Sequence, residues 1–157
     1  MSTSAHTTPD QAARKHWMGV LARAAEDALE EAWKGLERQP EHVWVRRPES
    51  GMTMVRGRAN GNGTPFNLGE MTVTRCALRL DDGVMGVAYV QGRSHRHAEL
   101  AALFDALLQR PDEAGRLQRQ VIAPLEHERS QAGEAARRRT AATRVEFFTM
   151  ATGRASS

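Results

Sequence analysis

The most regular pattern in the chain is a pair of alternating apolar and polar runs with a tight turn between them. The first run covers residues 71–80, the second covers residues 84–91, and Asp82-Gly83 separates them. Asp-Gly between two alternating runs is a strong signal for a β-hairpin. We therefore predict two antiparallel strands joined by a two-residue turn.

A two-residue turn fixes which residues face one another across the hairpin. The predicted core face comprises Cys76, Leu78, Leu80, Met85, Val87 and Tyr89. The opposite face carries Arg75, Ala77, Arg79, Gly86 and Ala88. Because this opposite face holds small residues and two arginines, we expect it to meet solvent or a partner.

Apolar residues at helical spacing mark the segments on both sides of the hairpin. An N-terminal stripe begins after Pro9 and fits either one long helix or two helices with a break near Ala25. A second stripe follows the hairpin and ends at Pro111, and a short helix is predicted over residues 112–122. Residues 125–143 are helix-prone, but their apolar stripe is too thin to belong fully to the core of this chain.

Three further strands are predicted from alternating or β-prone residues. Residues 42–47 and 52–56 form an antiparallel pair across a turn, and residues 57–68 form a loop. Residues 144–150 form a late strand, in which the adjacent Phe147 and Phe148 point to opposite faces. The predicted fold class is α+β, with a mainly antiparallel sheet of about four to five strands and helices packed on one face.

Length and composition narrow the classes of protein. The 157 residues suit one domain, which we place at residues 9–150, with disordered ends at residues 1–8 and 151–157. No run approaches the ~20 apolar residues of a membrane span. The first residues lack a signal-peptide pattern. We therefore expect a cytoplasmic protein with no membrane contact.

The distribution of charge and the number of cysteines argue against two further properties, nucleic-acid binding and an internal disulfide. The net charge is +3 and the sequence pI is about 9.7, which on its own suggests a nucleic-acid-binding module. However, the arginines are interleaved with acidic residues and no aromatic residues accompany them, so we expect no nucleic-acid partner. Cys76 is the single cysteine, which excludes an internal disulfide, and we expect it to be buried and inert.

The corner between the hairpin and the following helix holds the densest chemistry. Gly92 lets the backbone turn, and Ser94 can cap the helix. Four residues that can carry positive charge surround this helix start, Arg93, His95, Arg96 and His97, and the carboxylate Glu99 follows them. A helix N-terminus ringed by arginine and histidine can bind a phosphate, a phosphonate or a partner's carboxylate. The alternative is that these are solvated first-turn residues, with His97 half-buried.

Other chemistries lack the residues that they need. The segment His97-Ala98-Glu99 resembles the zinc deaminase pattern, but the second motif, Pro-Cys-x-x-Cys, is absent from the sequence. The pair His95 and His97 has no third ligand nearby, so we expect no metal. The segment Gly61-Asn62-Gly63 is followed by neither Lys-Ser/Thr nor a helix, which excludes a Walker loop.

Several elements carry residues that this chain alone is not expected to cover. Arg75 and Arg79 lie on one strand face, and we predict that Trp17, Arg79 and Phe148 face a partner. No Ser/His/Asp set and no paired carboxylates form a recognisable catalytic motif. These features favour a subunit of an assembly over a self-contained enzyme.

Several segments, taken in order, resemble the PhnG family, the G subunits of the bacterial carbon–phosphorus lyase core complex. They are residues 14–22 (Arg-Lys-His-Trp-Met-Gly-Val-Leu-Ala), residues 74–80 with Asp82-Gly83, residues 86–93 leading to His97-Ala98-Glu99, and residues 144–150 (Arg-Val-Glu-Phe-Phe-Thr-Met). The resemblance spans about residues 14–150, with a thin stretch at residues 25–67.

The resemblance implies a function that the residues alone do not. With the H, I and L subunits, such proteins form α-D-ribose 1-methylphosphonate 5-triphosphate from ATP and methylphosphonate, with release of adenine. It implies docking on the I subunit and a core assembly that also contains the H and J subunits. ATP is then a substrate of the complex, and an iron–sulfur cluster and S-adenosylmethionine are expected on another subunit, with no cofactor bound by this chain.

The resemblance assigns no catalytic residue. Arg75, Arg93, His97 and Glu99 match family motifs and become candidates for binding or assembly. The alternative is an independent anion- or nucleotide-binding enzyme built on the corner at residues 92–99.

Overall fold

The computed structural model describes the backbone of residues 10–58 and 61–151, and the side chains of these residues up to Ala142. The predicted disordered ends lie almost entirely outside this range. The elements in chain order are α1 (Gln11–Leu21), α2 (Glu26–Lys34), β1 (His42–Arg58), β2 (Pro65–Leu80), β3 (Met85–Gln91), α3 (His95–Leu108), α4 (Pro111–Leu117), the π-helical turn η2 (Gln118–Ile122) and α5 (Ala123–Ala151).

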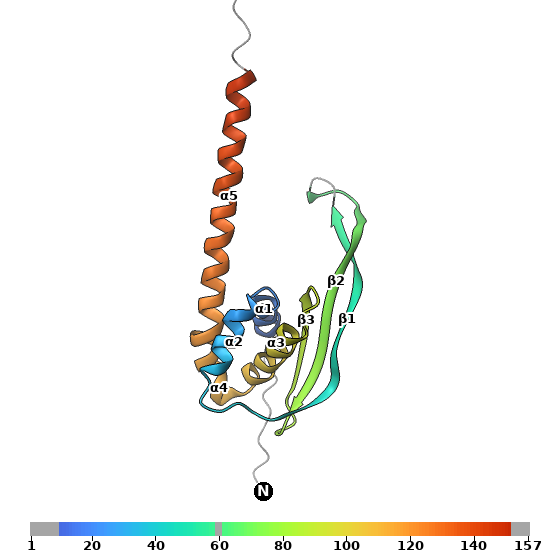
Figure 1. The fold of residues 1–157 in the computed structure, drawn as a ribbon, viewed down its shortest axis with the longest axis vertical. Coiled ribbons are helices and arrows are strands. Elements are labelled where there is room, and N and C mark those ends of the chain that lie inside the picture. The colour runs from blue at the N-terminus through green and yellow to red at the C-terminus, as the bar shows by residue number, and fades with distance from the viewer. Residues whose placement is uncertain (1–9, 59–60, 152–157) are drawn as a thin grey trace, which may run out of the picture.

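The strands form one antiparallel sheet in the order β1-β2-β3. Figure 1 shows the helices gathered on one side of this sheet, with α3 against it, while the other side is open. The α+β class and the one-sided helical layer are therefore confirmed. The sheet has three strands within the described residues, not four to five.

The strand count is lower because the two predicted strands at residues 42–47 and 52–56 are one strand, β1. The predicted turn at Pro48 is absent, and the pairing with β2 shifts register between Trp44 and Arg46 and again between Arg46 and Glu49. A proline is tolerated at an edge strand and at such irregularities because its missing N–H is not needed there. Half of the predicted loop at residues 57–68, namely residues 57–58 and 65–68, also belongs to the strands.

The hairpin between β2 and β3 forms, but its register differs from the prediction by one residue. The Leu80 N–H donates to the Val84 carbonyl at 2.9 Å, and the Gly83 N–H donates to the Leu80 carbonyl at 3.0 Å. The loop therefore has three residues, with Gly83 at φ 89°. A type I turn followed by a glycine in the left-handed region is the usual form of such a loop.

A shift of one residue moves every β3 side chain to the other face. Leu78 pairs with Gly86 and Cys76 pairs with Ala88, so Gly86, Ala88 and Val90 are buried. The prediction that Met85, Val87 and Tyr89 form the core face was wrong, whereas the β2 residues of that face, Cys76, Leu78 and Leu80, are in the core.

The reason for this register is the close approach of α3. A Cβ atom added to Gly86 would overlap the Ala102 carbonyl oxygen and would lie 3.0 Å from the Ala106 Cβ. Only a glycine fits between β3 and the backbone of α3 at this point. The small residues of β3 therefore belong to the core side, where the helix is closest, and the large ones point away from it.

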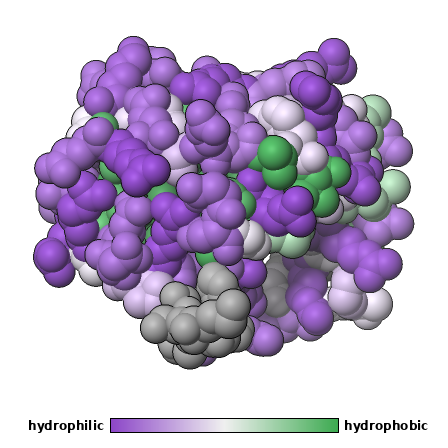
Figure 2. All heavy atoms as spheres, turned by 90° about the horizontal axis from the view of Figure 1, so that it is seen from below, coloured by the Kyte–Doolittle hydropathy of each residue, from purple (hydrophilic) through white to green (hydrophobic). Residues whose placement is uncertain are grey.

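Helix α3 is the centre of the core. Every residue from Leu100 to Leu108 is buried, and the helix contacts β2, β3, α1, α2 and α4. Trp33 of α2 meets Phe104 edge to face, with ring centroids 6.0 Å apart. Figure 2 views the end of the molecule below this core, where the surface is mainly hydrophilic and hydrophobic atoms gather toward the strand side.

The N-terminal stripe forms two helices, with the break between Leu21 and Glu26. Helix α1 is capped by Asp10, whose carboxylate accepts from the Ala12 N–H at 3.2 Å. Pro9, after which the stripe was predicted to begin, lies outside the described residues.

The predicted late strand at residues 144–150 was wrong, because these residues continue helix α5. The helix also passes Pro124, where the preceding π-turn bonds the Ala123 N–H to the Gln118 carbonyl. A π-turn adds a residue to the helix, which changes the carbonyl pattern that a proline ring meets.

We predict that Gly86→Ala destabilises the protein by about 1–3 kcal/mol, because the added methyl overpacks the contact between β3 and α3. The measurement is urea unfolding of the purified chain. Gly51→Ala in β1 is the matched control, since a Cβ there meets nothing within 4 Å. Equal unfolding midpoints for the two variants would contradict the packing argument.

Candidate functional site

The most deeply buried charged group is the carboxylate of Asp105, which lies on α3 and has no exposed surface. Its oxygens accept from Arg14 Nε at 3.1 Å, Arg14 Nη2 at 2.7 Å, Trp17 Nε1 at 2.9 Å and the Val87 N–H at 3.0 Å. One carboxylate therefore joins α1, α3 and the free edge of β3. It is fully occupied by protein donors, so it holds the fold together.

Trp17 is consequently part of this network. It is 6% exposed and its indole N–H points to Asp105. The prediction that Trp17 faces another subunit was wrong, because its side chain is buried and its indole N–H donates to Asp105, 88 residues away in the same chain. Two residues of the segment 14–22, Arg14 and Trp17, therefore stabilise the fold by binding Asp105.

The corner after β3 forms as expected around Gly92, whose φ is 93°. Ser94 caps α3 and accepts from the His97 N–H at 3.1 Å. The Ser94 hydroxyl also donates to the carboxylate of Glu26 from α2. The anion at this helix N-terminus is therefore the Glu26 carboxylate of the chain itself.

Two of the predicted corner residues are also bound within the chain. Arg96 pairs with Glu30 of α2 and with Glu99, each at 2.9 Å. The hydrogen bond from Arg96 lowers the pKa of Glu30. His97 is buried, with its Nε2 at 2.9 Å from the Leu21 carbonyl oxygen. The geometry of Arg96 and His97 therefore fits a structural role.

The remaining corner residues are more open. Arg93 is exposed, and no side-chain partner of it is found within the described residues. His95 is exposed, with its Nε2 at 3.4 Å from the Ser50 Oγ. Glu99 lies 3.8 Å from His42 in addition to its bond with Arg96. An external anion at this corner stays a prediction, and only Arg93 and His95 are placed to meet one.

Cys76 is buried in the core, and its Sγ donates to the Ala98 carbonyl at 3.1 Å. Burial, with a smaller contribution from the negative charge of Glu99, raises the pKa of this thiol to about 12. At neutral pH the thiol is protonated, and the thiolate is the nucleophilic form. The expected inert role of Cys76 is therefore supported by its surroundings.

The side of the sheet that carries no helices has a surface that we call the outer face. It comprises two rows across the three strands, Val43–Arg79–Met85 and Glu49–Arg75–Tyr89. Arg75 Nε lies 2.7 Å from the Glu49 carboxylate, which Arg46 also binds at 2.7 Å. Hydrogen bonds with Tyr89 and Glu49 raise the pKa of Arg75. Arg79 is exposed and has no side-chain partner within the described residues.

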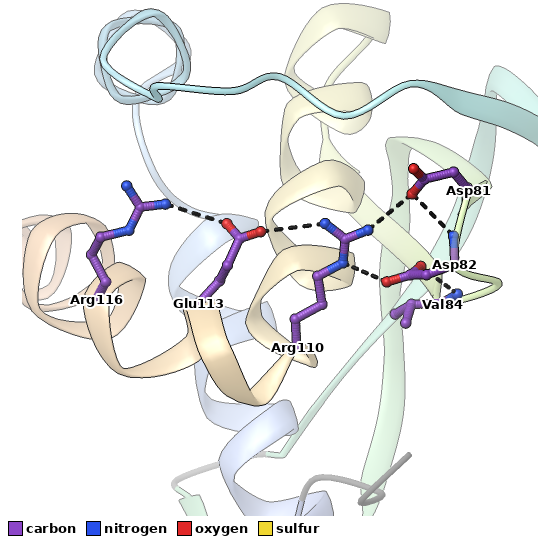
Figure 3. Close-up of polar contacts among 6 residues, drawn as sticks. All are labelled: Asp81, Asp82, Val84, Arg110, Glu113 and Arg116. Atoms are coloured by element: carbon purple, nitrogen blue, oxygen red, sulfur yellow. Dashed lines mark hydrogen bonds and ion pairs between the residues drawn. The ribbon is translucent and has the colours of Figure 1, made fainter. Parts of the chain in front are cut away.

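Sequence reasoning missed a charged network around Arg110, shown in Figure 3. Arg110 pairs with Asp82 at 2.6 Å, with Asp81 at 3.0 Å and with Glu113 at 3.3 Å, and Glu113 also pairs with Arg116. This network links the hairpin loop to the corner between α3 and α4. The adjacent Asp81 and Asp82 were the sign of it in the sequence, but Arg110 lies 28 residues after Asp82 and could not be matched to them.

Partial burial would raise the pKa of Asp82, but hydrogen bonds from Arg110 and from the Val84 N–H outweigh it and the pKa is lowered. The stabilisation by this carboxylate is therefore present above its ordinary pKa and is lost as the pH falls through the lowered value.

Two elements extend away from the body on the same side, as Figure 1 shows. One is the arm, which we define as residues 52–58 of β1 and 65–72 of β2, beyond the last pairing with β3 at Val73 and Gln91. The other is α5. The arm exposes four large apolar side chains that are between 46% and 65% accessible: Met52, Met54, Phe66 and Leu68.

Helix α5 is mostly exposed over the part whose side chains the structure describes, residues 123–142. Leu125 is the last buried residue of that part, and from Glu126 to Ala142 only Ala135 is even half-buried. No helix in the described part is long and apolar enough to span a membrane. Among the described residues, no group of three or more His, Cys, Asp or Glu side chains is arranged to hold a metal.

We predict that Asp105→Asn lowers the free energy of unfolding by about 3 kcal/mol. The carboxylate faces only donors, and the amide would replace one acceptor by an NH₂ group that confronts them. Urea unfolding measures the loss. The matched control is Glu128→Gln on the exposed part of α5, and a loss no larger than in this control would contradict the anchoring role.

Comparison with known proteins agrees with the resemblance in the sequence. The family described as "Phosphonate metabolism protein PhnG" matches residues 12–153. A protein from Rhizobium meliloti (strain 1021), named "Alpha-D-ribose 1-methylphosphonate 5-triphosphate synthase subunit PhnG", is 43% identical over 158 residues, which cover 98% of this chain and 99% of the relative. The chain therefore belongs to the PhnG family of phosphonate metabolism proteins.

Proposed function

We propose that this chain is the G subunit of the synthase that forms α-D-ribose 1-methylphosphonate 5-triphosphate, and that its role is to assemble the complex. The name of the Rhizobium meliloti relative supports the activity, because it describes a subunit of that synthase. The substrates would be ATP and methylphosphonate, and adenine would be released. The chain would act beside the H, I and L subunits and would dock on the I subunit, in a core that also contains J.

The observation that carries the assembly role is the exposed arm. Two strands without a third are at best marginally stable alone, and this arm extends by about 20 Å. Its exposed apolar side chains, Met52, Met54, Phe66 and Leu68, would be costly in a protein that acts alone. Burial against another subunit would remove that surface from water.

Helix α5 supports the same conclusion. A helix gains most of its stability in a protein from packing of an apolar face, and between Glu126 and Ala142 helix α5 packs almost no side chains against its own chain. Met52 and Met54 pair with Thr72 and Glu70, so they lie on the side of the sheet where the helices are. The arm and α5 would receive a partner between them.

Among the residues that the structure describes, the interior gives no sign of a complete active site. The buried carboxylate of Asp105 is surrounded by protein donors, and the thiol of Cys76 is protonated. The cations Arg96 and Arg110 are bound to carboxylates of the chain. A role in catalysis would therefore come from completing a site on a neighbouring subunit, and Arg93 and His95 are the open residues of the corner.

The test is co-expression of the tagged full chain with the H, I, J and L subunits, followed by affinity capture. We expect the wild-type chain to recover other subunits. The double variant Met52→Asp/Met54→Asp should recover at least tenfold less, because it adds charge to an apolar contact, while its far-ultraviolet circular dichroism stays unchanged.

The double variant Gln118→Asp/Gln120→Asp is the matched control, since it adds two carboxylates at exposed positions of the helical layer. A second readout is adenine release by the assembled subunits, which should require this chain. Failure of the wild-type chain to recover any subunit, or full synthase activity in its absence, would contradict the proposal.

A further inference from the structure

Strand β3 lies at the edge of the sheet, so half of its backbone groups point away from β2. In an antiparallel pair, residues that bond to the neighbouring strand alternate with residues that do not. The hydrogen bonds at the two ends of the pairing, at Val84 and at Gly92, fix this alternation. The residues whose N–H and carbonyl groups point away from β2 are Met85, Val87, Tyr89 and Gln91.

The chain itself binds only the start of this free edge. The Val87 N–H donates to Asp105 at 3.0 Å, and the preceding outward carbonyl accepts from Gln109 Nε2 at 2.7 Å. Within the described residues, no hydrogen-bond partner is found for the Val87 carbonyl, the Tyr89 N–H and carbonyl, or the Gln91 N–H. A row of unpaired N–H and carbonyl groups on an edge strand fits one kind of occupant, an extended strand.

An apolar pocket of about 180 Å³ lies beside the same part of β3, between this strand and α1. Met18 and Ala22 line it from α1, Ala88 from β3 and Ala101 from α3. Successive side chains of a strand point to opposite faces, and Ala88 is buried on the side of the helices. A strand added along the edge would therefore direct the side chain level with Ala88 into the pocket.

A second copy of this chain does not suit the pocket. Two copies paired through β3 would offer only Gly86, Ala88 and Val90 on the helix side. Gly86 has no side chain, and the side chains of Ala88 and Val90 are buried in their own core. Pairing of β1 of one copy with β3 of another would be head-to-tail, which generates a ring or an open fibre.

The ends of this chain do not suit the pocket either. Residues 1–9 and 152–157 contain no Val, Ile, Leu, Phe, Tyr or Trp that would fill an apolar space. The occupant that fits both the edge and the pocket is therefore an extended segment of a different protein, with an apolar side chain facing the helices.

We propose that an extended segment of another subunit adds a strand to the sheet at β3. It would bond to the outward backbone groups of residues 87–91 and place one apolar side chain in the pocket between α1 and β3. This inference rests on the proposed function, because it takes the strand from a subunit of the same assembly. It is separate from the arm, which lies beyond the last residues of β2 that pair with β3.

The first test is amide hydrogen exchange resolved to single residues. The full chain is compared alone and in the complex co-expressed with the H, I, J and L subunits. We expect the amides of Tyr89 and Gln91 to exchange at least tenfold more slowly in the complex, because each would gain a hydrogen bond. Two results would overturn the inference: equal exchange of both amides in the two states, or protection of both in the lone chain as its concentration rises, which would make a second copy the occupant.

The second test changes one backbone donor. Tyr89→Pro removes the outward N–H without removing a bond to β2, as a proline at an edge strand does. Tyr89→Thr is the matched control, since it keeps the N–H and also loses the phenol that contacts Arg75. We expect affinity capture of the tagged full chain to recover at least tenfold less of one subunit with Tyr89→Pro than with Tyr89→Thr.

Equal recovery with the two variants would overturn the inference while leaving the proposed function intact. A wild-type chain that recovers no subunit at all would contradict the proposed function, and this inference with it. Urea unfolding of both variants separates a lost contact from a lost fold. If Tyr89→Pro does not fold, the exchange measurement on the wild-type chain decides the question.

Discussion

The close approach of helix α3 to strand β3 is the constraint on which the rest of the structure depends. Gly86 leaves room for the Ala102 carbonyl, and only one register of the hairpin places Gly86 and Ala88 toward the helix. The same register sends Met85 and Tyr89 to the outer face. A steric requirement inside the core thus decides which side chains a partner can meet.

Asp105 completes this arrangement one turn further along α3. The free edge of β3 would otherwise present an unpaired N–H at Val87, and the carboxylate accepts it together with the donors of Arg14 and Trp17. The Asp105 carboxylate therefore fixes α1 and α3 to the edge strand β3. Within the described residues, the exposed large apolar side chains all lie on the strands, which is where we propose that the assembly surface lies.

Much of the fold could be read from the sequence because the signals were local. The alternation of β2, the Ser94 cap and the burial of Cys76 follow from neighbouring residues. The register of the β2–β3 hairpin could not be read in this way. Asp-Gly suits both a two-residue and a three-residue loop, and only the packing of α3 selects between them. The burial of Trp17 and the network of Arg110 depend on partners far along the chain. For residues 144–150, the continuing helix α5 overrode a β-prone composition.

The central claim is that the arm is an assembly element, and amide hydrogen exchange tests it most directly. The full chain is compared alone and within the co-expressed complex, with residues 95–108 of the buried helix α3 as the internal reference. The account predicts that exchange in residues 52–58 and 65–72 slows by at least tenfold in the complex, because burial against a partner protects the strand hydrogen bonds. Equal exchange of the arm in the two states would contradict it.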